Sequence, residues 1–300
     1  MRVGLQLNSD DPTTVADAAR RAEELGYDSV LVYDHVGFDS SPLLCLTAAA
    51  LATSAIRLGT FVLNASFLHP VLLARDVATL DRLSGGRVEV GLGAGHTPAE
   101  FAALGVTLGP AAERKARLAD FVGIVRRLID GETVEHSSRW FELAGASTGR
   151  ALQDRLPILV GGSGRSLLEP AARQADIVGL TGLGRTLPDG HRHVARFAAS
   201  VVDDEVAIVR AAAGAVGREV ELNVLVQRVE ITDDREAAAA KLAERIEGLT
   251  VADALATPFL ALGTHDEIAH HLRRAQDRWG IGYFVVREAE DFAPVIDRLR

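Results

Sequence analysis

The sequence predicts a single α/β domain, residues 1–300, that folds as a (β/α)8 barrel of the TIM type with insertions. Apolar strand-like runs alternate with helical patterns along the whole chain, and no change of composition marks a linker. Polar or glycine-rich residues follow most of the runs, at the strand ends where such barrels carry their chemistry. One barrel needs about 250 residues, so the length agrees with this interpretation.

The clearest strand–helix–strand unit begins with the uniformly apolar run 56–63, which is typical of a strand covered on both faces. Pro70 suits the first turn of a helix, and apolar residues recur at helical spacing from there to Gly85. A second apolar strand, 88–92, follows and ends in a glycine-rich turn. Parallel strands joined by a helix require a right-handed crossover, which is the repeating unit of the barrel.

The elements on either side of this unit keep the same alternation. Strand 3–7 leads to a helix at 12–25, which carries its apolar residues on one face and ends at Gly26. Strand 29–33 and an apolar helix at 42–53 complete the first part of the chain. After the glycine-rich turn, helical spacing predicts two further helices, at 98–104 and 111–130.

Two segments of the second half interrupt the alternation. Residues 131–156 indicate two short strands around a polar turn, and residues 183–202 lack a clear period, which predicts an irregular loop or a lid. The remaining strands are expected at 156–160, 176–180, 220–227 and 282–286, which brings the number of strands to eight. The remaining helices are expected at 165–174, 203–216, 234–246, 264–278 and 290–299.

Composition narrows the class of protein. The net charge is −9 and no basic block occurs, which argues against a nucleic-acid partner. The first residues, MRVGLQL, lack the layout of a signal peptide, and no run approaches 18 apolar residues. We therefore expect a soluble, cytoplasmic protein without membrane contact. Cys45 is the one cysteine, so an internal disulfide is excluded, and its apolar surroundings predict a small core residue.

Asp34, His35 and Asn64 lie where the second and third strands end, and we take them as candidates for function. A histidine at this place can exchange a proton near neutral pH or hydrogen-bond the edge of a heteroaromatic ring. The alternative is structural: the aspartate caps the following loop and holds the histidine. Metal binding is not expected, because His270 and His271 lack the i, i+4 spacing of helical metal ligands.

His96 follows the glycine-rich end of the fourth strand, where Gly91, Gly93 and Gly95 alternate with other residues. A dinucleotide fingerprint is rejected, because His96 stands where that motif requires a small residue. The glycines would still allow a flat ligand to approach the backbone. His96 is then a candidate catalytic or substrate-binding group, and the alternative is an exposed loop histidine.

The run Gly161, Gly162, Ser163, Gly164 joins the fifth strand to a helix. Backbone N–H groups and the helix dipole at such a turn favour a phosphate, and we expect the N–H groups of Gly162 and Gly164 to approach it. No GK[ST] follows, so the turn is not a P-loop. The alternative is a tight connection without a ligand. Thr181, which ends the next strand, joins the cofactor-binding candidates.

With these residues in hand, the chain resembles the bacterial luciferase-like superfamily of flavin and deazaflavin enzymes. Within it, the chain is most similar to the branch of oxidoreductases that use coenzyme F420. The resemblance extends almost from end to end, and it is carried by YDHV at 33–36, HPVLLARDVATLDRLSGGRVEVGLGAG at 69–95, PILVGGSGR at 157–165, LNVLVQRVEITDDREAA at 222–238 and LGTHDEI at 262–268.

The resemblance implies an isoalloxazine-type ring over the barrel mouth, beside Asp34, His35 and the end of the third strand, with its phosphate at 161–164. It also implies a non-proline cis peptide bond between Phe61 and Val62, which brings backbone against the ring. In the sugar-phosphate dehydrogenase relatives, an aromatic residue follows the Asp-His pair and a glutamate follows the glycine-rich strand end. Asp39 and His96 stand near those two places here. The substrate and the proton-transfer assignment of those relatives therefore do not carry over.

Three functions follow as expectations. The first is an enzyme that passes hydride between coenzyme F420 and an unidentified small organic substrate. The second is a monooxygenase that uses reduced flavin mononucleotide (FMN), supplied by a separate reductase. The third, from another class, is a barrel that binds flavin without catalysis. A homodimer is a further expectation.

Overall fold

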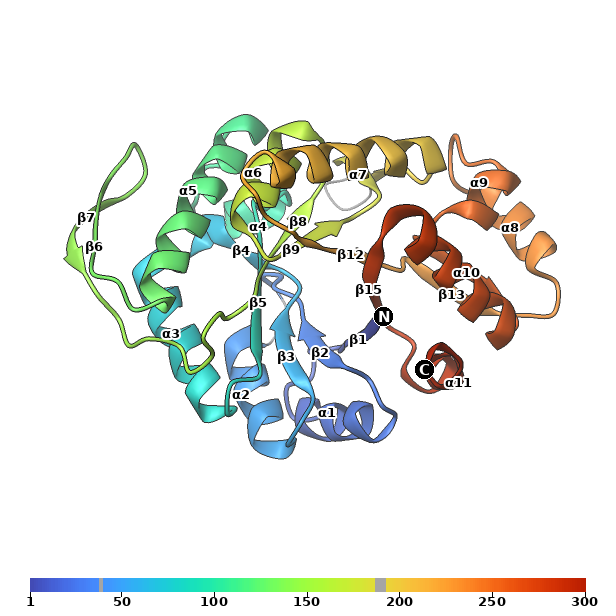
Figure 1. Ribbon diagram of the computed structural model, residues 1–300, viewed down its shortest axis with the longest axis horizontal. Coiled ribbons are helices and arrows are strands. Elements are labelled where there is room, and N and C mark those ends of the chain that lie inside the picture. Colours follow the sequence, from blue (N-terminus) through green and yellow to red (C-terminus); the bar gives the residue numbers. More distant parts are fainter. Residues whose placement is uncertain (38–39, 187–192) are drawn as a thin grey trace.

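The computed structural model describes residues 1–37, 40–186 and 193–300, and Asp39 lies outside the described residues (Figure 1). Parallel strands form a sheet in the order β3–β2–β1–β15–β12–β9–β8–β5–β4, and β3 also pairs with β5, so the sheet closes into the expected eight-stranded barrel. The strands are β1 (Arg2–Gln6), β2 (Ser29–Val32), β3 (Arg57–Thr60), β4 (Leu63–Asn64), β5 (Val88–Gly93), β8 (Ile158–Gly162), β9 (Ile177–Leu180), β12 (Glu221–Leu225) and β15 (Ile281–Val286). β3 and β4 share the third of the eight positions.

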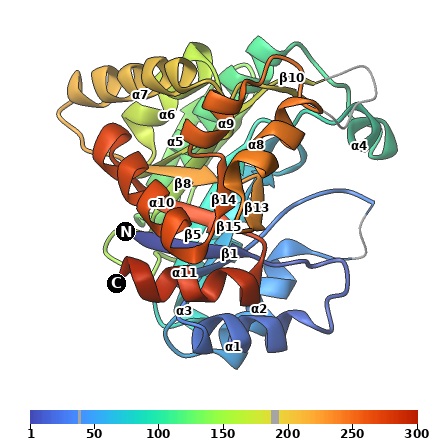
Figure 2. The ribbon, with the colours of Figure 1, turned by 90° about the vertical axis from the view of Figure 1, so that its right-hand side faces the viewer.

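Helices cover the outside of this barrel (Figures 1 and 2). They are α1 (Val15–Glu24), α2 (Pro42–Ala52), α3 (Pro70–Leu83), α4 (Pro98–Ala103), α5 (Ala111–Ile129), α6 (Arg165–Gln174), α7 (Ala199–Gly214), α8 (Arg235–Ala243), α9 (Val251–Ala256), α10 (His265–Trp279) and α11 (Ala289–Leu299). α10 is delimited by local chemistry: Thr264 and Glu267 form a capping box at its start, and Gly280 ends it with a φ of 70°. No helix in the described ranges is both long and apolar enough to cross a membrane.

The third barrel position is broken into two short strands. The apolar run 56–63 predicts one strand, but β3 ends at Thr60 and β4 begins at Leu63. The peptide bond between Phe61 and Val62 is cis, which confirms the expectation from the resemblance. Asn64 then opens a short 3-10 helix, η1 (Ala65–Phe67), by accepting the N–H of Ser66 with its side chain.

The prediction of a wholly irregular loop at 183–202 was wrong. β10 (Leu183–Thr186) pairs antiparallel with β11 (His193–Ala195), and α7 begins at Ala199 rather than at 203. Another pair of strands, which is parallel, was also missed: β13 (Arg228–Ile231) lies beside β14 (Leu260–Gly263), outside the barrel. In the segment 131–156, β6 (Val134–Ser137) and β7 (Glu142–Ala146) form an antiparallel hairpin beyond α3 and α5 (Figure 1).

Side chains fill the barrel, so a ligand can reach only its mouth. Leu31, Leu159, Ile177, Tyr283 and Val285 pack together on its inside, separately from the larger apolar layer between strands and helices, which includes the buried Cys45. The hydroxyl of Tyr283 donates to Glu89 at 2.6 Å and lies 2.5 Å from the hydroxyl of Ser29. The filled interior directs attention to the carboxyl ends of the strands.

Candidate active site

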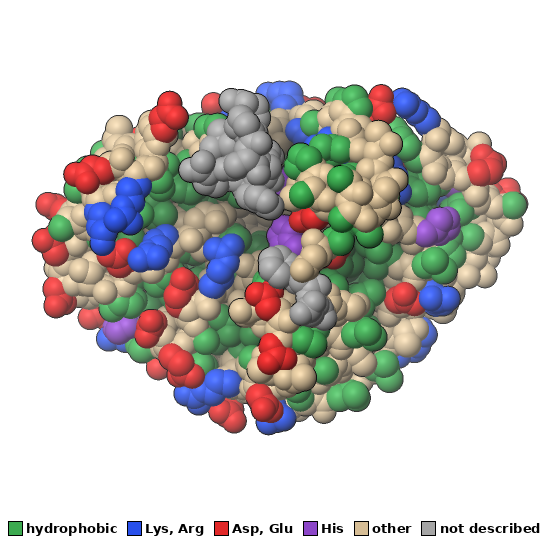
Figure 3. All heavy atoms as spheres, turned by 180° about the vertical axis from the view of Figure 1, so that it is seen from behind, with side chains coloured by type: hydrophobic (Ala, Val, Ile, Leu, Met, Phe, Trp, Pro, Cys, Tyr) green, Lys and Arg blue, Asp and Glu red, His purple; other side chains and the backbone are tan. Residues whose placement is uncertain are grey.

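The carboxyl ends of the barrel strands form one face of the molecule. Figure 2 shows the N-terminus, and so the start of β1, at the left, and α4 at the right beyond the strand ends. That right-hand side faces the viewer in Figure 3, where histidine and acidic side chains gather near the middle of the face. The candidate site is therefore a rim of titratable groups around the barrel mouth.

His35, which follows β2, is paired with an acidic residue that sequence reasoning missed. Its Nδ1 lies 2.7 Å from Oε1 of Glu100, in the first turn of α4. The Glu100 side chain is 9% exposed and that of His35 is 42% exposed, so the carboxylate is held inside while the imidazole reaches the mouth. The carboxylate accepts the Nδ1–H and thereby fixes the tautomer and the orientation of the ring.

Asp34 serves the backbone of the third strand position. Its carboxylate accepts the N–H of Asn64 at 2.9 Å, which joins the ends of β2 and β4. Burial raises the pKa of Asp34, and the nearby Glu100 adds to this effect, while the bond from Asn64 opposes it. Asp34 and Asn64 thus lie together at the mouth, as the sequence predicts. The contact between them holds the backbone of the two strand ends.

His96 lies against a second histidine. Its ring is 4.7 Å, centre to centre, from the ring of His193 on β11. His96 is exposed at the rim, and the residues around it nevertheless desolvate part of its imidazole. This desolvation, with the nearby His193 and His35, lowers the pKa of His96 to about 4. A neutral imidazole at physiological pH is the result.

The glycines before His96 are required by the packing of the chain itself, and a ligand beside them stays a prediction. A Cβ on Gly91 would lie 2.1 Å from the carbonyl oxygen of Thr60, and one on Gly93 would lie 2.7 Å from the side chain of Val62. A Cβ on Gly95 would meet the side chain of Asn64 at 2.4 Å. The chain itself fills the space, because the broken third strand position presses against β5.

Gln6 and Arg287 bind this break from the opposite side. The amide of Gln6, at the end of β1, donates to the carbonyl oxygen of Phe61 at 3.2 Å. Its own oxygen accepts a bond of 2.8 Å from Nε of Arg287, which follows β15. The ends of β15 and β1 are therefore joined by hydrogen bonds to the carbonyl of Phe61, across the end of β2.

The turn from β8 to α6 faces both the mouth and the protein interior. A Cβ on Gly161 would lie 3.5 Å from the side chain of Val62, so these two candidates meet at the mouth. A Cβ on Gly162 would point the other way, 2.7 Å from the buried side chain of Leu167. Gly164 has a φ of 78°, which glycine adopts readily.

The remaining polar groups of this turn already have partners. The hydroxyl of Ser163 donates to the carbonyl of Leu183 at 2.8 Å, and that of Thr181 accepts the N–H of Leu183 at 3.3 Å. Both candidates therefore hold the start of β10. The N–H of Gly164 donates at 3.2 Å to the buried carboxylate of Glu205, on α7. Sequence reasoning expected that N–H to face a phosphate.

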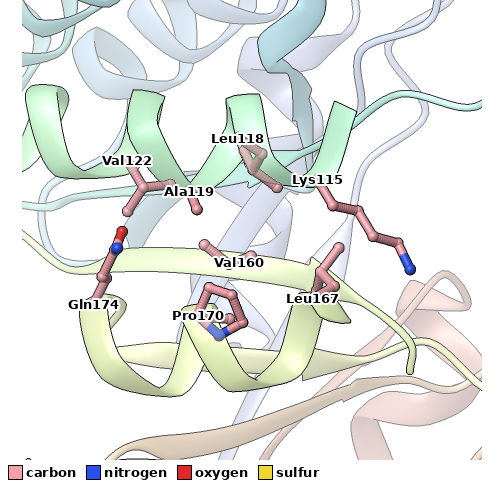
Figure 4. Close-up of a pocket in the computed structure, with 9 residues that line it drawn as sticks. Lys115, Leu118, Ala119, Val122, Val160, Leu167, Pro170 and Gln174 are labelled. Atoms are coloured by element: carbon pink, nitrogen blue, oxygen red, sulfur yellow. The ribbon is translucent and has the colours of Figure 1, made fainter. Parts of the chain in front are cut away.

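Two cavities differ greatly in size. One, of about 350 Å³, opens beside the barrel mouth, and its lining includes Asp34, His35, Val36, Leu43, Leu63 and Leu68. This volume is within the usual range for small-molecule sites. The other, between α5 and α6, is about 10 Å³ and has a largely apolar lining, so it holds no more than a water (Figure 4). Within the described ranges, no group of three His, Cys, Asp or Glu side chains could hold a metal ion.

Glu100 and Glu205 are the two site residues that sequence reasoning missed. Glu100 stands four residues after His96, near the place where the dehydrogenase relatives are expected to carry a glutamate. Its place in the first turn of a short helix after the strand end was the available sign. Glu205 lies in the middle of a long helix, and only the tertiary packing of α7 against α6 brings it to Gly164.

Comparison with known proteins gives matches of two kinds. The chain is 30% identical over 186 residues to F420-dependent glucose-6-phosphate dehydrogenase of Amycolatopsis mediterranei (strain U-32), over 59% of this chain and 56% of that protein. It is 36% identical over 135 residues to 4-hydroxyprotoasukamycin monooxygenase of Streptomyces nodosus subsp. asukaensis, over 43% of this chain and 36% of that protein. The chain thus spans little more than half, or less, of the length of these curated relatives.

A solved structure and a family model cover more of the chain. The coenzyme F420-dependent tetrahydromethanopterin reductase of Methanopyrus kandleri superposes with a TM-score of 0.77 at 20% identity, over 100% of this chain and 99% of that one. At this identity the likeness concerns the fold. The model of the luciferase-like monooxygenases matches residues 2–281. The chain therefore belongs to the luciferase-like monooxygenase family.

Proposed function

We propose that this chain is an oxidoreductase that transfers hydride between coenzyme F420 and an unidentified small organic substrate. The observation that carries the proposal is the pair formed by His35 and Glu100, a proton-exchanging group held by a nearly buried carboxylate at the barrel mouth. Family membership supports a flavin or deazaflavin coenzyme, and the names of the dehydrogenase relatives support F420 in particular.

The residues present fit such a coenzyme. Gly161 leaves the space of a side chain open beside Val62, where a flat ring would approach the mouth. At the start of α6, the backbone of the exposed residues Arg165 and Ser166 and the ammonium of Lys115, 3.1 Å from Ser166 Oγ, would be suited to a phosphate. Asp34 and Asn64 would frame the ring from the side of β2 and β4.

The protein would then contribute positioning and proton transfer. The bound coenzyme supplies a hydride donor or acceptor. Glu100 holds Nδ1 of His35, so a proton passed to or from the substrate would travel through Nε2. Leu43, Leu63 and Leu68 line the neighbouring cavity and would keep water from the reacting atoms. His96, with its lowered pKa, would accept a hydrogen bond from the substrate rather than repel a cation.

A second function, oxygen-dependent monooxygenation with reduced FMN, is favoured by the match to 4-hydroxyprotoasukamycin monooxygenase. This reaction would require a separate reductase as a partner. Titration of the purified apoprotein with F420 and with FMN, followed by absorbance, separates the two. F420 binding with hydride transfer is the expected result. FMN binding coupled to oxygen consumption would replace the first function with the second.

A further inference from the structure

The turn that joins β8 to α6 already holds a negative charge of the chain itself. The carboxylate of Glu205 accepts the N–H of Gly164 at 3.2 Å. Glu205 is 3% exposed, so packing fixes its position. Burial raises the pKa of its carboxyl, while the N–H of Gly164 and the nearby Arg196 oppose this and favour the charged form. A phosphate that approaches the same N–H group therefore meets a carboxylate.

Cations surround the same turn. Nη1 of Arg196 lies 3.6 Å from Oε1 of Glu205, and the Arg196 side chain is 40% exposed. The ammonium of Lys115 donates to a hydroxyl in the first turn of α6 at 3.1 Å, and Figure 4 shows this side chain extending from α5 toward that end of α6. Arg165 is engaged with Glu169 at 2.5 Å. Arg196 and Lys115 thus attract an anion to the turn, and the buried carboxylate of Glu205 repels it.

Phosphate groups differ in how well they tolerate such a carboxylate. A phosphomonoester, as in FMN, has a second pKa of about 6 and carries about −1.5 to −2 charges at pH 7. The phosphodiester of coenzyme F420 carries a single charge. Because charges near a poorly solvated carboxylate are screened less than in water, the second charge of the monoester adds repulsion that the diester avoids.

We propose that Glu205 determines specificity at this turn: it favours a coenzyme with a singly charged phosphodiester over one with a doubly charged phosphomonoester. The inference rests on the proposed function and assigns the choice between its two coenzymes to one residue. Arg196 and Lys115 attract both kinds of phosphate and attract the more highly charged one more strongly. A preference for the diester would therefore come from Glu205, whose carboxylate accepts an N–H of the turn.

The test compares the affinity of F420 and of FMN for the wild-type apoprotein and for Glu205→Gln, measured by quenching of coenzyme fluorescence. Glutamine keeps the size of the side chain and an oxygen for the Gly164 N–H, but removes the charge. FMN should bind about tenfold or more tightly to the variant, whereas the affinity for F420 should change by less than about threefold. The matched control is Asp204→Asn, which removes a charge from the exposed side of the same helix and should alter neither affinity.

An unchanged preference in Glu205→Gln would overturn the proposal, as would a wild-type protein that binds FMN as tightly as F420. If this variant fails to fold, the wild-type protein still tests the idea with simple phosphates: dimethyl phosphate should raise the melting temperature more than methyl phosphate at equal concentration, and the reverse order would count against the proposal. Methyl phosphate and dimethyl phosphate, compared by thermal shift, need no coenzyme binding. They separate failure of this inference from failure of the proposed function.

Discussion

At the scale of single residues, the contact between His35 and Glu100 is the feature closest to chemistry. We predict that His35→Ala lowers turnover by about 10²–10⁴-fold, as expected when a proton-transfer group is lost. The melting temperature should change little, because 42% of the His35 side chain is exposed. Steady-state kinetics with the coenzyme that binds, together with thermal melting, measure both effects.

Glu100→Gln separates orientation from proton transfer in the same pair. The amide keeps the shape of the side chain but not its charge, so the rate should fall less than in His35→Ala, with a changed dependence on pH. A His35→Ala protein that turns over at the wild-type rate but melts much earlier would give this pair a structural role instead.

Gly161 and Gly162 make a matched pair for the coenzyme site, because their missing side chains would point in opposite directions. We predict that Gly161→Val weakens coenzyme binding about tenfold or more with little loss of stability, since its Cβ would face Val62 at ordinary contact distance. Gly162→Val should instead cost about 1–3 kcal/mol of stability, because its Cβ would lie 2.7 Å from Leu167.

Coenzyme titration measures the affinity of both variants, and urea unfolding measures their stability. Gly162→Val tests the packing against Leu167, and the expectation that the N–H of Gly162 approaches the phosphate stays a prediction. Wild-type coenzyme affinity in Gly161→Val would remove the ring from this side of the mouth.

The sequence placed some of these residues and could not place others. Asp34, His35 and Asn64 follow apolar strands, so their position at the mouth can be predicted from the pattern alone. Glu100 and Glu205 act on groups 65 and 41 residues away along the chain. Contacts of that separation depend on how helices pack over the barrel, which local spacing does not contain.

At the scale of elements, the glycines of β5 allow the chain between β3 and β4 to pack closely against β5. We predict that Gly91→Ala destabilises the fold by about 3 kcal/mol or more, near the upper end for overpacking, because its methyl group would lie 2.1 Å from the Thr60 carbonyl. Gly123→Ala is the control: nothing lies within 4 Å of its added methyl group, and α5 should gain up to about 1 kcal/mol. Urea unfolding of the two variants should therefore give shifts of opposite sign. Equal stability of Gly91→Ala and the wild type would show that the third strand position can move away.

α10 carries a buried histidine that makes stability depend on pH. His271 is 4% exposed, and its Nε2 donates to the carbonyl of Thr257 at 2.8 Å. Burial lowers the pKa of His271 to about 4, against 6.5 in the unfolded chain. The unfolded state thus binds the proton more readily. The free energy of unfolding is therefore unaffected by His271 above pH 6.5 and falls as the pH drops from 6.5 toward 4.

We predict that His271 accounts for about 2 kcal/mol of the stability lost between pH 7 and pH 5. The measurement is urea unfolding of the wild type and of His271→Gln at both pH values. Glutamine keeps a donor for the Thr257 carbonyl but does not titrate, so the variant should lose correspondingly less. An equal loss in both proteins would mean that other groups cause the acid sensitivity.

The eight barrel strands could be predicted because each is an apolar run that ends in glycine or polar residues. β13 and β14 were missed for a related reason. β13 continues almost directly from β12, so the run 220–227 and its extension give one signal for two strands. β14 is only four residues long and α10 follows almost at once, so the apolar run is too short to indicate a strand.

At the scale of the whole molecule, α2 is the element least explained by a single copy of the chain. None of its 11 residues is charged, and it is apolar on all sides, a pattern that predicts a buried helix. Nevertheless Leu44 is 71% exposed and Leu51 is 74% exposed. α3, which packs beside α2, adds Leu72 at 51% exposure. We call these three leucines the α2–α3 patch.

Exposed leucines on two neighbouring helices are suited to a protein–protein interface. We propose a second copy of this chain as its partner, in a symmetric dimer in which each α2–α3 patch covers the other.

We predict that the wild-type protein is a dimer by light scattering at micromolar concentration and that Leu51→Glu is a folded monomer. A carboxylate forced into an apolar interface should weaken association about 100-fold or more. Val216→Glu, at an exposed position after α7, should leave the dimer intact. A dimer that persists in Leu51→Glu would place the interface elsewhere, and a monomeric wild type would leave α2 without a partner of this kind.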